Sequence, residues 1–468
     1  MYELETDYLV VGAGASGMAF VDSLLSSSAC EVVLVDRRHR PGGHWLDAYP
    51  FVRLHQPSAY YGVNSRVLGT NRIDESGPNA GFYERATASE ICDYYNRVLD
   101  EQFVASGRVR FVPMSEYRGG DGDGHHVVSL LNGAETSVKV RRKFVDATYV
   151  ESEIPSTHTP SFEVDEGVRF LPPNGLVHFR EPASGFTVIG AGKTAVDTCC
   201  WLLETGVAPD AIRWIKPRDA WVLNRAFTQP LELLGSSYMQ LQAHWVSAAA
   251  QAEDATDFAH RLEASGVFLR FDEAVEPTMF RGSTMSKWEL EQGRQIENVV
   301  RLGRVRRISA TEVMLDEGSL PTDAGQVYVD CTASGVRATV PRPLFEDARI
   351  NLEYVTVGVI PWGASTVGYI EATRDDTSEK NRLCPPVVFS GWSADLLDLA
   401  RAGMTGLLAR GAEADFAAWS DRARLNPAGG VASRGNDPDL ANALAVLSAS
   451  VGPAMQKFER TLGPAPST

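Results

Sequence analysis

The chain has few cysteines, a deficit of positive charge and no long hydrophobic run. Its six cysteines form no CxxC pair and have no histidine partners at metal-ligand spacing, so we expect a reducing compartment and neither a dithiol centre nor a metal site. The formal net charge of −16 argues against nucleic acid or an anionic membrane as the main partner. No apolar stretch is long enough to cross a bilayer, and the acidic start MYELETD lacks the pattern of a signal peptide. Together these absences predict a soluble, cytoplasmic protein.

The remaining composition is that of an ordinary globular protein. With 44% hydrophobic and 22% charged residues, the chain is not expected to be disordered. Its 468 residues exceed one ordinary core, so we expect two or three domains. The informative features are local motifs, and two of them are rich in glycine.

The first glycine-rich motif lies in the stretch YLVVGAGASGMAFVDSLL, which begins at Tyr8. An apolar strand precedes Gly12, Gly14 and Gly17, a helix follows them, and a second strand, EVVLVD, ends at Asp36. In a dinucleotide-binding unit the first glycine permits a tight turn, the second lets the backbone approach a pyrophosphate, and the third lets the helix pack on the strand. The helix N-terminus would then bind the phosphates, and Asp36 would accept a hydrogen bond from a ribose hydroxyl.

A second stretch, FTVIGAGKTAVDTCCWLLETG, repeats this arrangement with Gly190, Gly192 and Ala195, the last being a permitted small replacement. The strand that follows, AIRWIK, leads into Lys216 and Arg218 instead of an acid. Basic groups at this place suit the 2′-phosphate of NADP, whereas an acid favours NAD. The alternative is that both are ordinary surface cations.

Two dinucleotide units in one chain suggest FAD at the first and NADPH at the second, in an α/β fold with two Rossmann-like domains. Strands that end at Ala147-Thr148 and at Thr332, before and after the second motif, indicate that one domain is inserted into the other. We expect an FAD-binding domain of residues 1–160 and 331–468, and an NADPH-binding domain of residues 161–330.

The segment 229–300 is longer than a dinucleotide domain needs, and its apolar spacing predicts a largely helical insertion. A helical cover over the active site and a homodimer interface are both open interpretations of it. The adjacent Cys199 and Cys200 lie in a helical pattern, where neighbours point apart, so we expect no redox role for them.

Four stretches of the chain, GAGASGMAF, RPGGHWLDAYP, GAGKTAVD and RDAWVLNR, resemble the class B flavoprotein monooxygenases, that is, the flavin-containing monooxygenases and their Baeyer–Villiger relatives. They lie within the first 225 residues, and the two strand ends extend the match to about residue 335. The resemblance implies an enzyme that uses FAD, NADPH and O2, forms a C4a-hydroperoxyflavin and transfers one oxygen atom to a small organic substrate.

The resemblance also implies which residues face the flavin. Gly42 and Gly43 would let the backbone come close to the cofactor, and Trp45 would form a flat apolar wall. His55 and Gln56 stand where family members have an asparagine facing the flavin, so either could act as the hydrogen-bond donor. The residues implied as catalytic are His55, Gln56 and Arg225, the last near the nicotinamide. Those expected to bind the cofactors are Gly12, Gly14, Ala15, Ser16, Gly17, Asp36, Arg37, Gly43, His44, Trp45, His55, Gln56, Thr148, Gly190, Gly192, Lys193, Thr194, Lys216 and Arg218.

The sequence departs from the family pattern at two places. The stretch FLPPNGLVHFRE keeps a phenylalanine, a glycine and His178 of the family's identifying motif but not its spacing, and Tyr149 replaces a glycine. These changes argue against a standard Baeyer–Villiger enzyme. Two other functions stay open: an NADPH-dependent flavin oxidoreductase without oxygen transfer, which ordinarily needs a cysteine pair, and a flavoprotein whose nicotinamide site is not catalytic.

Overall fold

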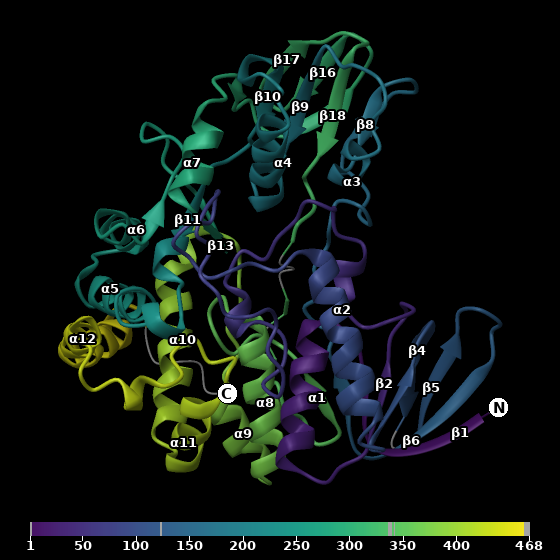
Figure 1. Cartoon of the computed structure of the whole chain (residues 1–468), viewed down its shortest axis with the longest axis vertical. Coiled ribbons are helices and arrows are strands. Elements are labelled where there is room, and N and C mark those ends of the chain that lie inside the picture. Colours follow the sequence, from purple (N-terminus) through teal and green to yellow (C-terminus); the bar gives the residue numbers. More distant parts are fainter. Residues whose placement is uncertain (1, 122–123, 336–338, 341, 463–468) are drawn as a thin grey trace.

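Two largely parallel sheets, one in the lower and one in the upper part of Figure 1, carry the two glycine-rich loops. The structure, a computed structural model, describes residues 2–121, 124–335, 339–340 and 342–462. Its mixed α/β architecture with Rossmann-like units confirms the fold class expected from the sequence.

The first sheet contains β1 (Tyr2–Val11), β2 (Val32–Val35), β3 (Val109–Val112), β4 (Ser115–Asp121), β5 (Gly124–Ser129), β6 (Glu135–Asp146) and β19 (Arg349–Asn351). Its order is β3-β2-β1-β6-β5-β4, and β19 also pairs with β6. The strands β1, β2, β3, β6 and β19 are parallel, whereas β5 is antiparallel to both β4 and β6. β1 begins earlier than the sequence suggested, because the residues before Tyr8 also pair with β6.

The second sheet contains β8 (Arg169–Leu171), β9 (Gly185–Ile189), β10 (Ile212–Ile215), β14 (Val299–Val300) and β18 (Gln326–Asp330). All five are parallel, in the order β14-β10-β9-β18-β8. These strands lie between β6 and β19 in the chain. The chain therefore leaves the first sheet after β6, builds the second sheet, and returns to the first sheet at β19.

Two smaller sheets accompany the second one. The first comprises β11 (Ala220–Asn224), β12 (Phe268–Leu269) and β13 (Met279–Met285). The other comprises β7 (Glu163–Val164), β15 (Val305–Ile308), β16 (Glu312–Leu315) and β17 (Gly318–Pro321). β13 runs parallel to β11, which begins directly after the basic residues that follow β10.

The α-helices of the described residues are α1 (Ala15–Ser27), α2 (Ala88–Val98), α3 (Pro173–Leu176), α4 (Lys193–Glu204), α5 (Tyr238–Gln251), α6 (Ala255–Ala264), α7 (Lys287–Arg294), α8 (Ile360–Thr373), α9 (Thr377–Leu383), α10 (Leu396–Gly411), α11 (Ala414–Arg422) and α12 (Pro438–Leu462). The expected helical insertion thus consists of α5, α6 and α7, but it also contains the strands β12 and β13. Figure 1 shows α5, α6, α10 and α12 grouped at the left of the molecule, where their apolar faces share one core.

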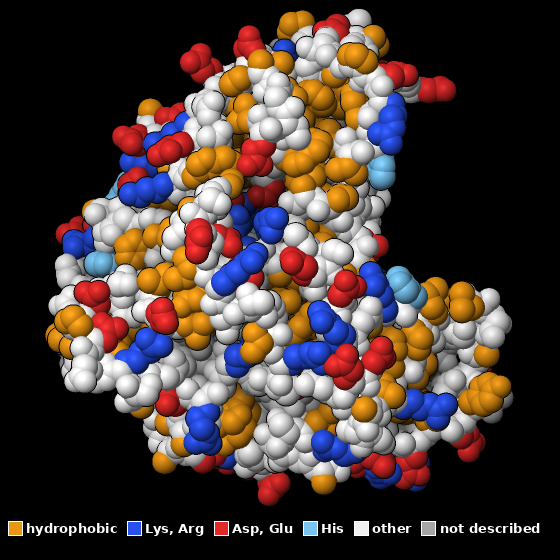
Figure 2. Space-filling view, viewed as in Figure 1, with side chains coloured by type: hydrophobic (Ala, Val, Ile, Leu, Met, Phe, Trp, Pro, Cys, Tyr) orange, Lys and Arg blue, Asp and Glu red, His pale blue; other side chains and the backbone are white. Residues whose placement is uncertain are grey.

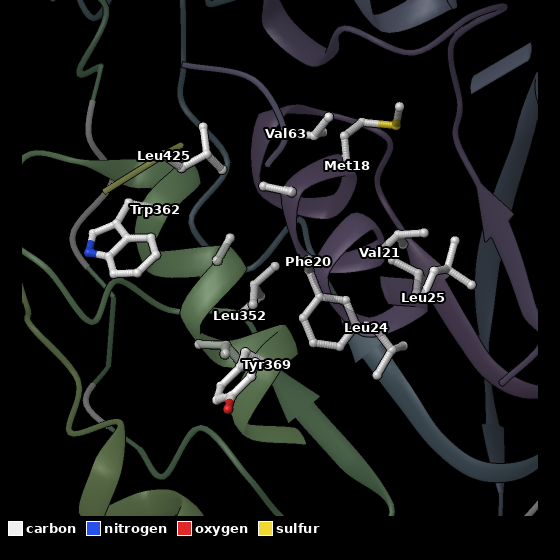
Figure 3. Close-up of a cluster of buried hydrophobic side chains, with 14 of the residues drawn as sticks. Met18, Phe20, Val21, Leu24, Leu25, Val63, Leu352, Trp362, Tyr369 and Leu425 are labelled. Atoms are coloured by element: carbon white, nitrogen blue, oxygen red, sulfur yellow. The ribbon is translucent and has the colours of Figure 1, made fainter. Parts of the chain in front are cut away.

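The largest core lies where α1 packs against α8 (Figure 3). Phe20 and Leu24 of α1 are fully buried there, and the Phe20 ring points toward α8. Trp362 and Tyr369, both on α8, instead stack on a tryptophan of α11. A Cβ added at Gly368 would lie 2.5 Å from the Phe20 carbonyl oxygen, so this glycine permits the close approach of the two helices. The core fixes α8, from the distant C-terminal part, beside α1, the helix that follows the first glycine-rich loop.

No helix of the described residues is both long enough and apolar enough to cross a membrane.

Candidate functional site

The first glycine-rich loop joins β1 to α1 and is shaped to receive a phosphate. The N–H of Gly12 donates to the Val35 carbonyl at 2.8 Å, which ties the loop to the end of β2. A Cβ added at Gly17 would lie 1.9 Å from the Gly12 carbonyl oxygen, so the contact between helix and strand requires glycine. No described side chain caps α1, whose first turn contains Ala15 and Ser16, so its N–H groups can bind a pyrophosphate. These features fit the FAD site expected here.

The glycine pair that precedes Trp45 lies directly against this loop. Gly42 and Gly43 have φ angles of 135° and 57°, which glycine adopts without strain. A Cβ added at Gly43 would lie 2.9 Å from the Gly14 Cα. The pair leads into a short 3-10 turn, residues 43–46, that carries His44 and Trp45. Close packing of two backbones therefore explains why the chain has consecutive glycines here.

Asp36, at the end of β2, has a role that the sequence did not suggest. Its Oδ2 accepts from the Ala13 N–H at 2.7 Å and its Oδ1 from the Arg38 N–H at 2.8 Å, and the residue is 5% exposed. The carboxylate thus fastens the glycine loop, in addition to any bond with a ribose. The neighbouring Arg37, also expected to bind the cofactor, forms an ion pair with Glu151.

The second loop repeats the first, but it is more open. The N–H of Gly190 donates to the Ile215 carbonyl at 3.0 Å, and a Cβ added at Gly190 would lie 2.4 Å from the Cys331 carbonyl oxygen. A Cβ added at Gly192 would meet no described atom within 4 Å. No described side chain caps α4, so its first turn also offers N–H groups to a pyrophosphate.

The structure corrects the expectation for Lys216. Its side chain is buried, its Nζ donates to Asp219 Oδ1 at 2.6 Å, and it lies 4.5 Å from the ring centre of Trp214. Burial lowers its pKa, although Asp219 acts in the opposite direction. Arg301 also pairs with Asp219, at 2.8 Å. Because Lys216 faces the interior and already has an anionic partner, it cannot receive a cofactor phosphate.

Three other arginines lie beyond the end of β10 without an acidic partner. Arg218 is half-buried, Arg281 and Arg304 are exposed, and no carboxylate of the described residues lies within ion-pair distance of any of them. Partial burial and the positive charges of Arg304 and Arg281 lower the pKa of Arg218. In Figure 2, Lys and Arg side chains lie among Asp and Glu side chains across the middle of the face shown. Uncompensated cations held near one another favour an anionic ligand.

A cavity of about 300 Å³ lies between the two glycine-rich units and is lined mainly by apolar and aromatic side chains. Its wall includes Trp45, Tyr49, His55 and Gln56 from the first unit, Thr194 and Arg281 from the second, and Tyr354, Ile360 and Phe389 from the C-terminal part. The residues expected to face a flavin and Thr194, expected to bind the second cofactor, thus border one space.

His55 and Gln56 differ in how free they are to contact a ligand. Burial, together with the positive charge of Lys193, lowers the pKa of His55 to about 3, so its imidazole is neutral at physiological pH. The Nε2 of Gln56 instead donates to the carbonyl of Gly358, just before α8. Gln56 therefore holds the start of α8 against the cavity, and His55 is the better candidate for a donor to a bound ligand.

A buried group of five charged residues lies behind the His55 side of the cavity. The carboxylate of Glu289 pairs with Lys193 at 3.0 Å and with Arg225 at 2.7 Å, and Arg85 lies 3.8 Å away. Asp197 is the second partner of Lys193. Burial alone would raise the pKa of Glu289, but the surrounding cations hold it well below its usual range.

Arg225 belongs to this group and does not reach the cavity, contrary to the expectation of a catalytic role near the nicotinamide. Its Nε donates to the His55 carbonyl at 3.1 Å, and the same carbonyl accepts from Thr284 Oγ1 at 2.7 Å. Lys193 is likewise buried, and its Nζ pairs with Asp197 and Glu289 of the charged group. Arg225 therefore positions the backbone of His55.

Comparisons with known proteins bear on the first glycine-rich loop and on the family of the chain. A family model described as "NAD(P)-binding Rossmann-like domain" matches residues 10–62, which hold the first glycine-rich loop. Over 423 residues the chain is 42% identical to "Uncharacterized protein Rv2000" of Mycobacterium tuberculosis (strain ATCC 25618 / H37Rv) and to "Uncharacterized protein Mb2023" of Mycobacterium bovis. Each match covers 90% of this chain and 78% of the relative. The chain belongs to the protein family of these mycobacterial relatives.

Solved structures similar to this member of the family include two flavoenzymes. One is a flavin-containing monooxygenase from Stenotrophomonas maltophilia, with 17% identity, a TM-score of 0.41, and coverage of 89% of this chain and 99% of that chain. The other is cyclohexanone monooxygenase from Rhodococcus sp. Phi1 bound to NADP+, with 16% identity, a TM-score of 0.48, and coverage of 87% and 99%.

Sequence reasoning missed several residues of the site. Glu289 had a local signal, since Ser286 and Glu289 form a helix-capping box, but nothing in the sequence showed that it would meet Arg225. Arg281 had no local signal. Tyr49 belongs to the stretch RPGGHWLDAYP that was expected to face the flavin, but the bond from its hydroxyl to Asp197, at 2.8 Å, had no signal in the sequence. Thr148, expected to bind a cofactor, uses its hydroxyl to bond Asp146 at 2.7 Å.

Proposed function

We propose that the protein is an FAD- and NADPH-dependent monooxygenase that transfers one oxygen atom from O2 to a small organic substrate. The observation that supports this most is the apolar cavity bordered by both glycine-rich units, with Trp45 on one side and Thr194 on the other. Two nucleotides bound at the two helix N-termini can direct their reactive rings into this space. We also propose that residues 1–160 and 331–468 form the FAD-binding domain and residues 161–330 the NADPH-binding domain.

The first unit would hold FAD. Its pyrophosphate would lie at the N-terminus of α1, beside Gly14 and Gly43, and its ring system would enter the cavity along Trp45. When FAD is bound and reduced by NADPH, it supplies the electrons that activate O2 for transfer. The indole N–H of Trp45 donates to the Tyr61 hydroxyl at 2.7 Å, which fixes the orientation of this wall.

The second unit would hold NADPH at the N-terminus of α4. The 2′-phosphate would lie among Arg218, Arg281 and Arg304, because these cations have no acidic partner in the described part of the chain. This proposal retains the preference for NADPH that the sequence suggested, but it moves the phosphate from Lys216 to the three arginines.

The cavity wall would protect the oxygen transfer from water. Trp45, Tyr354 and Phe389 present aromatic surface, and exclusion of water suppresses the release of hydrogen peroxide. His55 is neutral and can donate one ring N–H to the reacting oxygen at any pH above about 4. The start of α8, held by Gln56, presents the positive end of its helix dipole to the cavity, where it stabilises negative charge.

The cysteines count against a disulfide reductase. All six are buried as free thiols, and none of them lines the cavity. Burial raises the pKa of Cys200 to about 12 and that of Cys384 to about 12, so neither thiol is a nucleophile at neutral pH. An oxidoreductase that works without oxygen transfer would therefore have to reduce an external acceptor.

Oxygen uptake and peroxide release test the proposal. The purified protein is loaded with FAD and mixed with NADPH in air, with and without amines, thioethers and ketones as candidate substrates. We expect consumption of NADPH and O2 in equal amounts, and a substrate that lowers the peroxide formed per NADPH while an oxygenated product appears. A protein that oxidises NADPH only with an added acceptor such as a quinone, with no oxygenated product from any candidate, contradicts the proposal.

A further inference from the structure

The short segment Ser390–Ser393, from the C-terminal part of the chain, contacts two of the three uncompensated arginines. The guanidinium carbon of Arg218 lies 4.4 Å from the ring centre of Trp392. Gly391 has a φ of 84°, and a Cβ added to it would lie 3.2 Å from Arg281 Nε. One segment thus packs against two side chains that come from a distant part of the sequence.

Backbone hydrogen bonds hold this segment beside β13. The Phe280 N–H donates to the Gly391 carbonyl at 3.1 Å, and the Ser393 N–H donates to the Thr278 carbonyl at 3.0 Å. The Ser393 hydroxyl also donates to the Pro277 carbonyl, at 3.2 Å. The position of the segment therefore does not depend on its aromatic side chain.

Trp392 is 49% exposed, so its ring does not serve mainly to fill a core. Arg218, by contrast, is held close to the like charges of Arg281 and Arg304, which repel it. A tryptophan face attracts a guanidinium through its ring quadrupole and offsets part of this repulsion. The contact accounts for an exposed indole at this place better than apolar burial does.

We propose that Trp392 is a positioning residue for a phosphomonoester ligand, and that it holds the Arg218 guanidinium ready for the 2′-phosphate of NADPH. This inference rests on the proposed function and extends it to a residue outside the second glycine-rich unit. A guanidinium held over an indole face still has N–H groups free to donate to phosphate oxygens. A cation that is already in place loses less conformational freedom when the ligand arrives.

Paired nucleotide probes test the proposal without any catalytic turnover. The dissociation constants of adenosine 2′,5′-bisphosphate and of 5′-AMP are measured by calorimetry on the FAD-loaded wild type, Trp392→Ala and Trp392→Phe. We expect Trp392→Ala to bind the bisphosphate about fivefold more weakly with unchanged binding of 5′-AMP, since a cation–π contact contributes roughly that much. Trp392→Phe keeps an aromatic face and should retain most of the affinity. Should Trp392→Ala not fold, Trp392→Gln removes the aromatic face with a smaller loss of volume and is judged by the same criterion.

The outcomes separate this inference from the proposed function. An equal loss for both probes, no loss, or no rescue by phenylalanine overturns the role of Trp392 while leaving the preference for NADPH intact. A wild type that binds the two probes equally well overturns the NADPH assignment itself, and the role of Trp392 with it.

Discussion

The two glycine-rich units share one backbone design and differ in the side chains that follow it. In both, the first glycine N–H donates to the end of the next strand, Gly12 to Val35 and Gly190 to Ile215. The strand paired with the first strand of each unit is β6 in the first sheet and β18 in the second. Each of these strands ends in an aspartate that accepts a hydrogen bond from a threonine hydroxyl two residues later, at 2.7 Å in both cases. The repeated bonds show that the second unit is a structural repeat of the first.

The difference begins at the end of the second strand of each unit. In the first unit, the carboxylate of Asp36 closes the loop by accepting from Ala13. In the second, Lys216 turns inward to Asp219, and Arg218 is left without an acidic partner in the described residues. Under the proposed assignment, two similar backbones would bind different nucleotides, and a few side chains after the strand would make the choice.

The largest expected effect is the loss of nucleotide binding when the glycine loop of one unit is altered and the other is left intact. Gly14→Ala and Gly192→Ala both place a methyl group where a pyrophosphate must approach, yet the added Cβ has room in each fold, 3.5 Å from Gly43 Cα in the first case and free of neighbours within 4 Å in the second. We expect Gly14→Ala to weaken FAD binding by about 3 kcal/mol, or roughly a hundredfold. Gly192→Ala should keep FAD and weaken NADPH binding by a similar factor.

Flavin absorbance per chain and NADPH titration measure the two losses, and each variant is the control for the other. If both variants lose both cofactors, the assignment of one nucleotide to each unit is wrong.

The sequence predicted the repeated design because local rules determine it. Strand, glycine spacing, helix and the following acid or base are all read from neighbouring residues, and the return of the chain to the first sheet followed from two similar strand ends. The direction in which Lys216 points was not predictable, because it depends on Asp219 and on the rings of Trp214 and Phe271. Burial of a cation depends on such tertiary neighbours and leaves no spacing pattern.

The charged group behind His55 was invisible for a related reason. Lys193, Arg225 and Glu289 come from separate segments of the chain, and each has an ordinary local context. Packing within the second unit, where α7 lies against α4, brings them together, and Arg85 joins them from the first unit. The cavity itself could be anticipated on the side of Trp45, where a motif exists, but not on the side of Phe389.

A smaller effect on nucleotide affinity is expected from the arginines that lie beyond the end of β10. Arg304→Ala removes a cation without an acidic partner in the described residues, so we expect NADPH to bind about tenfold more weakly and NADH to be unaffected, since a charge-assisted contact contributes roughly 1.5 kcal/mol. Arg306→Ala is the matched control. Arg306 lies two residues after Arg304, and its side chain is paired with Asp316. Fluorescence titration with both nucleotides measures the change.

Lys216→Ala should behave differently from either arginine variant. Removal of one partner from a buried ion pair costs about 3 kcal/mol of the free energy of unfolding, and the ratio of NADPH to NADH affinity should remain that of the wild type. Chemical denaturation and the same titrations measure both quantities. A stable Lys216→Ala variant that has lost its preference for NADPH would restore the original assignment of the phosphate to Lys216.

The smallest expected effect is on the free energy of unfolding at mildly acidic pH. It arises in the first unit, which supplies the histidines of the cavity wall in the described structure. Burial lowers the pKa of His55 from 6.5 to about 3, so the unfolded chain takes up a proton at a higher pH than the folded one. The resulting stability is fully present above about pH 6.5 and is lost as the pH falls toward 3. Between pH 8 and pH 6 this amounts to about 1 kcal/mol.

His55→Asn, which keeps a hydrogen-bond donor, should therefore lose about 1 kcal/mol less than the wild type over that range. His39→Asn, at an exposed histidine of the same unit, serves as the control and should follow the wild type. Urea unfolding at the two pH values measures the difference, and equal losses in His55→Asn and the wild type would show that the imidazole of His55 is accessible to protons in the folded state.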